Sequence, residues 1–206
     1  MSKPSMKFTL GAGLLALACQ AMAAQAGMAT HQHHMQMMKE SKSKSAQVKT
    51  VKVALPQVQV VRQDGAKVDF PTEVGTDKPV VLAFIYTTCT TLCPVTSQIL
   101  SRAQSMFGPD IEKVKIISVS IDPDFDTPEK LVEYSRKYGA TPNWQHYTGK
   151  LSDIIAIQKA FSAYRGDKMN HIPLFFVSGK DKSQWTRFDG FPAPMDLVME
   201  AKKLSL

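Results

Sequence analysis

Residues Val80 to Leu100, VVLAFIYTTCTTLCPVTSQIL, carry the pattern from which the fold can be predicted. The first seven residues are apolar, are rich in β-branched and aromatic side chains, and are too few for a helix, which predicts a buried central strand. Further along, Val95, Ile99 and Ala103 form one apolar face at helical spacing. The stretch therefore predicts a strand that leads into a helix, with a short polar turn between them.

Two cysteines, Cys89 and Cys93, lie in that turn. Pro94 follows the second one, and proline is favoured at the first helical position while it pushes the residue before it out of the α region. Cys93 is therefore expected at or beside the N-cap of the helix, with Cys89 in the loop before it. Both thiols would then lie near the positive end of the helix dipole, which lowers a thiol pKa and favours the thiolate.

A structural disulfide is a poor explanation for this pair of cysteines, because a bridge that closes so small a loop removes little chain entropy. Two buried cysteines acting as small apolar side chains would be out of place in a threonine-rich turn at the carboxyl end of a strand. That edge is where ligands bind in open α/β sheets. The pair indicates redox chemistry or the binding of a soft metal ion.

The first 26 residues have the features of a secretion signal. A positively charged start precedes an apolar run at residues 8–18, and small residues follow, with cleavage candidates that end at Ala23 and Ala26. The apolar run is shorter than a transmembrane helix requires. Lipidation at Cys19 and an uncleaved anchor are the alternatives. In each case the protein is expected in the periplasm or on the outer face of the inner membrane.

Residues 28–38, MATHQHHMQMM, are rich in histidine and methionine. Imidazole and thioether groups are expected copper ligands, and the thioether particularly suits the cuprous ion. The spacing defines no single coordination geometry, so a tail of chance composition is the alternative. The secondary metal-ligand candidates in this tail are His31, His33, His34, Met35, Met37 and Met38.

Residues 39–52 are a basic linker with five lysines and one glutamate. The signal and this linker account for most of the chain's net charge of +7, so the remainder of the chain is nearly neutral. Nucleic-acid binding therefore has no support. The chain divides into a signal peptide (1–26), a disordered His/Met-rich and Lys-rich tail and linker (27–52) that could associate with anionic lipid, and one folded domain (53–206).

The folded domain is long enough for one good hydrophobic core. Asp64-Gly65, with alternating apolar residues on both sides, predicts a hairpin. The expected order is a hairpin (58–70), a strand (80–86), a helix ending near 107, a strand (114–121), a helix from Pro128 capped by Thr127, a connection (139–149), a helix (151–164), a strand (173–178), an edge strand (185–188) and a closing helix from Pro194. This order, with a dithiol at the strand-to-helix turn, predicts an α/β, thioredoxin-like fold: a central mixed sheet flanked by helices, with an N-terminal β-hairpin.

His171 is the third candidate site residue. It lies in MNHIPLFFV, directly ahead of a buried strand. In thioredoxin-like folds a cis-proline at the start of this strand faces the cysteine turn, and Pro173 in that place would bring His171 to the same surface as the two thiols. Two thiolates and one imidazole suit Cu(I), and they suit Cu(II) with an added oxygen ligand. His146 lacks such partners and is expected to be a surface or packing residue.

CTTLCP at 89–94, DPDFDTP at 122–128 and His171 ahead of the FFV strand together resemble the Sco/SenC family of copper chaperones. Members of this family assist assembly of the binuclear copper centre of cytochrome c oxidase. The resemblance runs from about Gln57 to the C-terminus, and the C-x-x-x-C-P motif with a distal histidine is fairly specific, because ordinary thioredoxins use C-x-x-C. It implies copper ligands at Cys89, Cys93 and His171 and an acidic loop at Asp122, Asp124 and Asp126.

The chain departs from the family beside the histidine, where Asn170 and Ile172 replace the usual aspartate and serine, and where Pro173 is more typical of a thioredoxin. These departures favour redox activity, whereas the His/Met-rich tail favours copper.

Three functions remain open. The leading hypothesis is a monomeric copper metallochaperone, which would act with a copper-receiving subunit of cytochrome c oxidase or with another copper chaperone. The second is a periplasmic thiol:disulfide oxidoreductase that reduces the cysteines of a copper-receiving protein. A peroxidase is the least supported.

Overall fold

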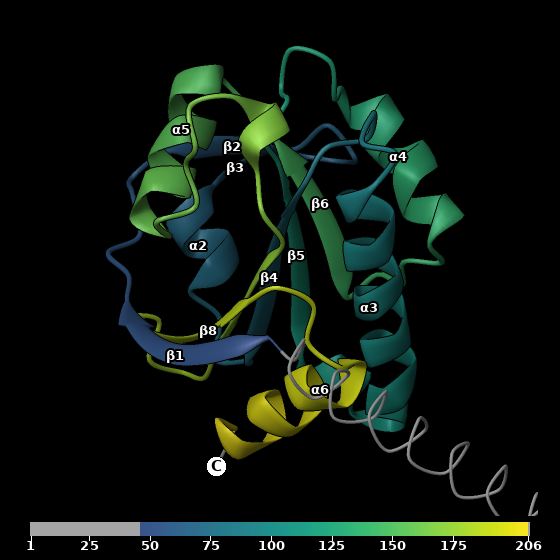
Figure 1. The fold of residues 1–206 in the computed structure, drawn as a ribbon, viewed down its shortest axis with the longest axis vertical. Helices are drawn as coiled ribbons and strands as arrows, with labels where there is room; N and C mark the ends of the chain where they lie inside the picture. The colour runs from purple at the N-terminus through teal and green to yellow at the C-terminus, as the bar shows by residue number, and fades with distance from the viewer. Residues whose placement is uncertain (1–45, 206) are drawn as a thin grey trace, which may run out of the picture. The chain divides into compact units, whose positions relative to one another are not determined.

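Strand β4 (Val80–Ile85) is the central element of the computed structural model, which describes residues 46–205. All six of its side chains are buried, as the unbroken apolar run predicts. It pairs in parallel with β5 (Lys115–Ser120) and antiparallel with β7 (Leu174–Ser178). The loops at the carboxyl end of β4 and the loop that precedes β7 therefore meet at one edge of the sheet (Figure 1).

The described residues form one mixed sheet of eight strands in the order β1-β8-β7-β4-β5-β6-β2-β3. The hairpin that Asp64-Gly65 predicts is confirmed, because β2 and β3 are antiparallel and Gly65 between them has a φ of 84°. The strands outside the centre are β1 (Gln47–Lys52), β2 (Gln59–Arg62), β3 (Lys67–Asp69), β6 (Trp144–Thr148) and β8 (Gln184–Asp189).

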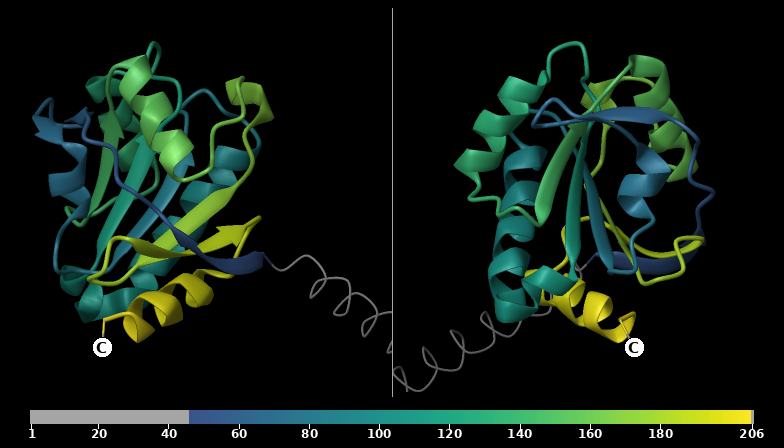
Figure 2. Two further views of the ribbon diagram at one scale, coloured as in Figure 1. Left: turned by 90° about the vertical axis from the view of Figure 1, so that its left-hand side faces the viewer. Right: turned by 180° about the vertical axis from the view of Figure 1, so that it is seen from behind.

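Helices cover both faces of this sheet, which confirms the predicted architecture. Figures 1 and 2 show α3 (Leu92–Phe107), α4 (Pro128–Lys137) and α6 (Pro194–Lys203) on one face, with α2 (Phe70–Val74) and α5 (Leu151–Ala160) on the other. Two short 3-10 helices, η1 (Gly108–Lys113) and η2 (Lys168–Asn170), complete the described elements. None of the helices between residues 46 and 205 has both the length and the hydrophobicity needed to cross a bilayer.

The predicted ends of two helices are confirmed by their local geometry. Helix α4 begins at Pro128, and the Thr127 hydroxyl accepts a hydrogen bond from the Lys130 N–H at 3.5 Å. Helix α3 ends at Phe107, and the next residue, Gly108, has a φ of 55°, in the left-handed region that favours glycine.

Three predicted assignments are wrong, and each error concerns pairing between distant segments. Residues 47–52, expected in the linker, form β1, which pairs antiparallel with β8. The strand that contains residues 185–188 is therefore not an edge strand, because β1 lies outside it. Residues 144–148, expected in a connection, form β6 beside β5. β1 has mostly exposed side chains, so no alternation of apolar residues marks it in the sequence.

Candidate metal site

Cys89 and Cys93 lie where the chain leaves β4 and enters α3. The helix begins at Leu92, slightly earlier than Pro94 predicts, so Cys93 is its second residue. The N-cap residue makes no side-chain capping bond. Instead, the Cys93 N–H donates to Cys89 Sγ at 3.4 Å, and the Tyr86 N–H donates to Cys93 Sγ at 3.4 Å. Each sulfur thus accepts a hydrogen bond from a backbone N–H group.

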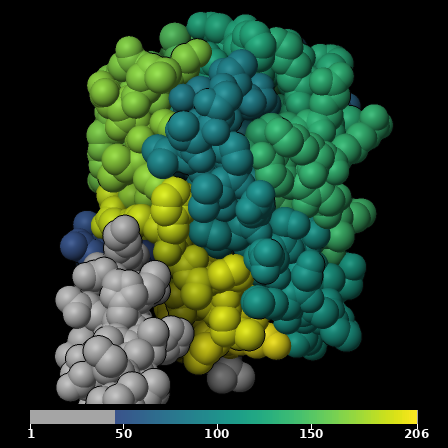
Figure 3. Space-filling view, turned by 45° about the vertical axis from the view of Figure 1, so that its right-hand side comes forward, coloured from purple at the N-terminus to yellow at the C-terminus, as the bar shows by residue number. Residues whose placement is uncertain are grey.

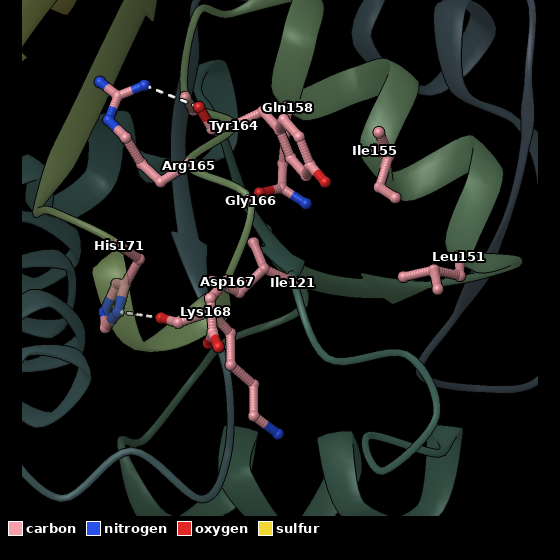
Figure 4. Close-up of a pocket in the computed structure, with 11 residues that line it drawn as sticks. Ile121, Leu151, Ile155, Gln158, Tyr164, Arg165, Gly166, Asp167, Lys168 and His171 are labelled. Atoms are coloured by element: carbon pink, nitrogen blue, oxygen red, sulfur yellow. Dashed lines mark hydrogen bonds between the residues drawn. The ribbon is translucent and has the colours of Figure 1, made fainter.

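The loop between α5 and β7 brings His171 to these sulfurs. His171 Nδ1 lies 2.8 Å from the Lys168 carbonyl oxygen, so Nδ1 carries the proton and Nε2 keeps its lone pair. Nε2 lies 3.5 Å from Cys93 Sγ. A pocket of about 180 Å³ lies beside His171. Figure 4 shows side chains that line this pocket and the bond from His171 to Lys168.

The expected cis-proline is not part of this arrangement. No peptide bond between residues 46 and 205 is cis, so that prediction for Pro173 is wrong. His171 is instead held by η2, which ends one residue before it. The side chain of Asp167 caps this short helix by accepting a hydrogen bond from the Met169 N–H at 2.8 Å.

The sulfurs of Cys89 and Cys93 and a ring nitrogen of His171 all lie within 4.8 Å of one another. In trigonal coordination with metal–ligand bonds of about 2.0 to 2.3 Å, the ligand atoms would be about 4 Å apart. His171 Nε2 and Cys93 Sγ are already slightly closer than this, at 3.5 Å, and no pair is more than 4.8 Å apart, so small side-chain shifts suffice. No other such group of cysteine, histidine or acidic residues occurs in the described part of the chain. In the space-filling view the light-green segment of the 160s borders the teal segment of the cysteine turn (Figure 3). The donor set fits a soft metal ion at the surface.

The two thiols differ in acidity, which corrects one prediction. Burial opposes ionisation of Cys89, but hydrogen bonds from the backbone N–H groups of Cys93 and Thr91 outweigh it and lower the pKa of Cys89 to about 7. Cys93 is fully buried, and this burial raises the pKa of its thiol above the ordinary value despite its place in the first helical turn. Partial burial lowers the pKa of His171, which keeps its imidazole neutral and able to bind a metal.

In the reduced, metal-free protein, Cys89 is expected to react with iodoacetamide at least about tenfold faster than Cys93. The thiolate is the reactive form, and Cys89 is the more acidic of the two thiols. The thiolate fraction of Cys89 grows as pH rises through about 7, so its rate of alkylation should rise over the same range. Peptide mapping by mass spectrometry after brief alkylation at several pH values measures both rates. Equal rates at the two cysteines would contradict this difference in acidity.

The acidic loop after β5 positions its neighbours and takes no part in the cluster of ligand atoms. Asp126 is fully buried and accepts hydrogen bonds from the Ser120 hydroxyl at 2.6 Å and from the Thr87 N–H at 3.1 Å, which ties this loop to the cysteine turn. Asp122 pairs with Lys168 at 2.6 Å and so ties it to the loop of His171. Asp124 is exposed.

Sequence reasoning missed Tyr86, whose ring packs edge-on against the ring of His171 with 5.0 Å between their centroids. The apolar run 80–86 shows that Tyr86 is the last residue before the cysteine turn. It does not show that the ring of Tyr86 packs against His171. The alternative of a packing residue holds for His146, which is fully buried and stacks on Trp144. The tail candidates His31, His33, His34, Met35, Met37 and Met38 lie outside the described residues.

Comparisons with known proteins identify the family of this chain. The model of the SCO1/SenC family matches residues 51–205. The SCO1 protein homolog of Bacillus subtilis is 30% identical over 154 residues, which cover 69% of this chain and 78% of that protein.

Two solved structures share the fold. BsSco, described as a member of the Sco family of cytochrome c oxidase assembly proteins with a disulfide switch, is 26% identical with a TM-score of 0.65; the match covers 76% of this chain and 96% of BsSco. Bradyrhizobium japonicum ScoI, solved with copper bound, is 23% identical with a TM-score of 0.60 over 71% of this chain and 96% of ScoI. The predicted thioredoxin-like fold is thereby confirmed. The match of the family model over most of the chain, together with the identity to the Bacillus subtilis protein, shows that this chain belongs to the SCO1/SenC family.

Proposed function

We propose that this protein is an exported copper metallochaperone that carries one copper ion on Cys89, Cys93 and His171. It passes the ion to a copper-receiving protein during assembly of cytochrome c oxidase. The observation that carries the proposal is the convergence of two sulfurs and a free imidazole nitrogen within 4.8 Å.

The choice of copper rests on the ligand set and on the relatives. Two thiolates and an imidazole also suit zinc. Soft thiolates in a three-coordinate group favour Cu(I), and a relative, ScoI of Bradyrhizobium japonicum, has been solved with copper bound. BsSco is described as a cytochrome c oxidase assembly protein, which supports the same destination for the copper of this chain.

The acidities of the ligands support capture and release at neutral pH. Cys89 is partly ionised there, and the neutral imidazole of His171 offers Nε2 directly. The thiol of Cys93 gives up its proton to solvent only when the ion replaces it, so binding releases a proton. A recipient that brings competing thiolates can therefore remove the ion while Cys93 takes its proton back.

The test of the proposed function is the copper stoichiometry and absorption spectrum of the reduced, secreted protein. One tightly bound copper per chain, with sulfur-to-copper charge transfer for Cu(II), is expected, and any copper held by the tail should bind more weakly and lack this band. A protein that binds no copper with its thiols reduced would overturn the proposal.

A thiol:disulfide oxidoreductase is the second candidate function, and the unequal thiols are the observation that favours it. In this scheme the Cys89 thiolate attacks a partner disulfide and forms a mixed disulfide. Cys93, after losing its proton, then attacks Cys89 Sγ. The partner leaves as a dithiol, and Cys89 and Cys93 remain joined as a disulfide, so two electrons pass to the partner. The disulfide switch described for BsSco supports exchange of this kind.

We further propose that the His/Met-rich segment at residues 28–38 is a second, weaker copper site on a tether. Its imidazole and thioether groups suit copper, and a tether raises the effective concentration of captured copper near the folded domain.

A synthetic peptide of residues 27–45 is expected to bind Cu(I) more weakly than the whole protein but with a dissociation constant below the millimolar range. Imidazole and thioether groups are softer ligands than water but bind less tightly than a pair of thiolates. Titration against a chromogenic Cu(I) chelator measures the constant. A control peptide with every histidine and methionine changed to alanine should not bind, and absence of binding by the native peptide would contradict the capture role.

A further inference from the structure

Met169 lies beside the three candidate ligands and has no role in the site as described so far. Its side chain is 71% exposed, although it is large and apolar. Its Sδ accepts a hydrogen bond from the Tyr86 hydroxyl at 3.7 Å. A thioether sulfur is a soft ligand that particularly suits Cu(I). The exposed sulfur is therefore a chemically suitable donor next to a candidate copper site.

Tyr86 connects this thioether to the site. The hydroxyl of Tyr86 contacts Met169, its ring packs against the ring of His171, and its backbone N–H donates to Cys93 Sγ. A single side chain and its own backbone thus contact Met169 and two of the three candidate ligands. The thioether is separated from the site by one aromatic ring.

The backbone of Met169 is held by hydrogen bonds, whereas its side chain is largely exposed and has a single long hydrogen bond, to Tyr86. The Met169 N–H donates to Asp167 Oδ1 at 2.8 Å, and the preceding residue, Lys168, accepts the bond from His171 through its carbonyl oxygen at 2.8 Å. The short helix η2 therefore holds Met169 and His171 in one rigid unit. The methionine side chain has three rotatable bonds, so its sulfur is not confined to the position beside the Tyr86 hydroxyl.

We propose that Met169 is an exchangeable fourth ligand for Cu(I), which receives the ion before it reaches Cys89, Cys93 and His171 and holds it again as it leaves. The inference rests on the proposed copper function and adds a ligand to it. A bond from Met169 Sδ to Cu(I) forms as a bond from the donor molecule breaks, and it breaks when the three ligands have closed on the ion. Copper stays Cu(I) throughout, no electron is transferred, and the Cys93 proton passes to solvent.

A ligand used in both directions changes rates more than equilibrium affinity. Met169→Leu keeps the size and apolar character of the side chain and removes the sulfur, at little cost to stability. We expect Cu(I) uptake and Cu(I) release each to slow by about tenfold, which corresponds to ~1.4 kcal/mol in each activation free energy. The equilibrium affinity should change much less, because both rates fall together.

The measurement uses the full mature chain with its dithiol reduced. Stopped-flow mixing with Cu(I) gives the uptake rate, and mixing the one-copper protein with bathocuproine disulfonate gives the release rate. Met199→Leu is the matched control, because Met199 is 64% exposed and lies on α6, an element that carries none of the three candidate ligands. The tail is the same in the wild type and in both variants, so its methionines cancel from the comparison.

A second readout observes the sulfur directly. With methyl-labelled methionine, the resonance that Met169→Leu removes should shift when wild-type protein receives one equivalent of Cu(I), whereas the resonance of Met199 should not. Unchanged uptake and release rates in Met169→Leu would overturn the proposal whatever the resonance does. Equal slowing in Met199→Leu would also overturn it, because the loss would then be independent of position.

These outcomes are distinct from failure of the proposed function. A wild-type protein that takes up no Cu(I) on its thiols would refute the copper function itself. A wild-type protein that binds one Cu(I) on its thiols, with Met169→Leu kinetics identical to it, would refute only the role of Met169.

Discussion

Replacement of both thiols, Cys89→Ala with Cys93→Ala, is expected to eliminate the sulfur-to-copper charge-transfer absorption of the Cu(II)-loaded protein. These thiolates supply two of the three candidate ligands, and charge transfer from sulfur requires a thiolate bound to the ion. The segment of residues 27–45 contains no cysteine, so copper held there cannot produce the same band. Tight binding of Cu(I), measured by competition with a chelator, should be lost with the band.

Thr90→Ala is the matched control for the double variant. Thr90 lies in the same turn and is exposed, and its replacement leaves both sulfurs in place. Because Cys93 is fully buried, thermal unfolding of the double variant must show that it folds. A folded double variant that retains the charge-transfer band would refute the assignment of the thiolate ligands.

His171→Ala is expected to lower copper affinity by orders of magnitude and to leave the dithiol chemistry nearly unchanged. The imidazole is one of the three candidate ligands whose donor atoms converge, so its loss leaves only the two thiolates at this point. Partial burial lowers the pKa of His171, and a neutral ring places no positive charge beside the thiolates. The reduction potential of the dithiol should therefore move by less than about 30 mV, which corresponds to a tenfold change in equilibrium for a two-electron couple.

Both quantities should be measured on one preparation, by Cu(I) competition and by equilibration with glutathione. Ile172→Ala, at the exposed neighbouring position, controls for disturbance of the loop. If the copper affinity is unchanged and the reduction potential shifts by much more than about 30 mV, the ligand role of His171 is refuted. The oxidoreductase would then become the leading function.

Much of the fold follows from short-range patterns in the sequence. The buried strand β4, the turn and the start of α3 are encoded within twenty-one consecutive residues, so apolar spacing and Pro94 predict them. β1 could not be predicted in this way. It forms because its backbone pairs with β8, more than one hundred residues later in the chain. Its side chains are mostly exposed, so they show no alternation of apolar and polar residues that would predict a strand.

The convergence of Cys89, Cys93 and His171 was predictable because the carboxyl end of β4 and the start of β7 meet at one sheet edge. The way in which the chain holds His171 at the site was not predictable, since it depends on the short helix η2 and not on a cis-proline. The raised pKa of Cys93 also could not be predicted from the sequence. Proximity to a helix start can be read from spacing, whereas complete burial of a sulfur depends on every neighbour in three dimensions.

The ion pair between Lys168 and Asp122 gives dissolved salt an influence on this site. It joins the loop that carries His171 to the loop after β5, and its lysine side chain is partly exposed to solvent. Counter-ions screen an exposed pair of this kind, whereas the buried bonds of Asp126 to Ser120 and Thr87 are shielded from them. Rising ionic strength therefore weakens the ion pair that supports the loop of His171, whereas the hydrogen bonds of Asp126 to the cysteine turn are little affected. The position of the imidazole is thus more sensitive to the surrounding electrolyte than the positions of the two thiols.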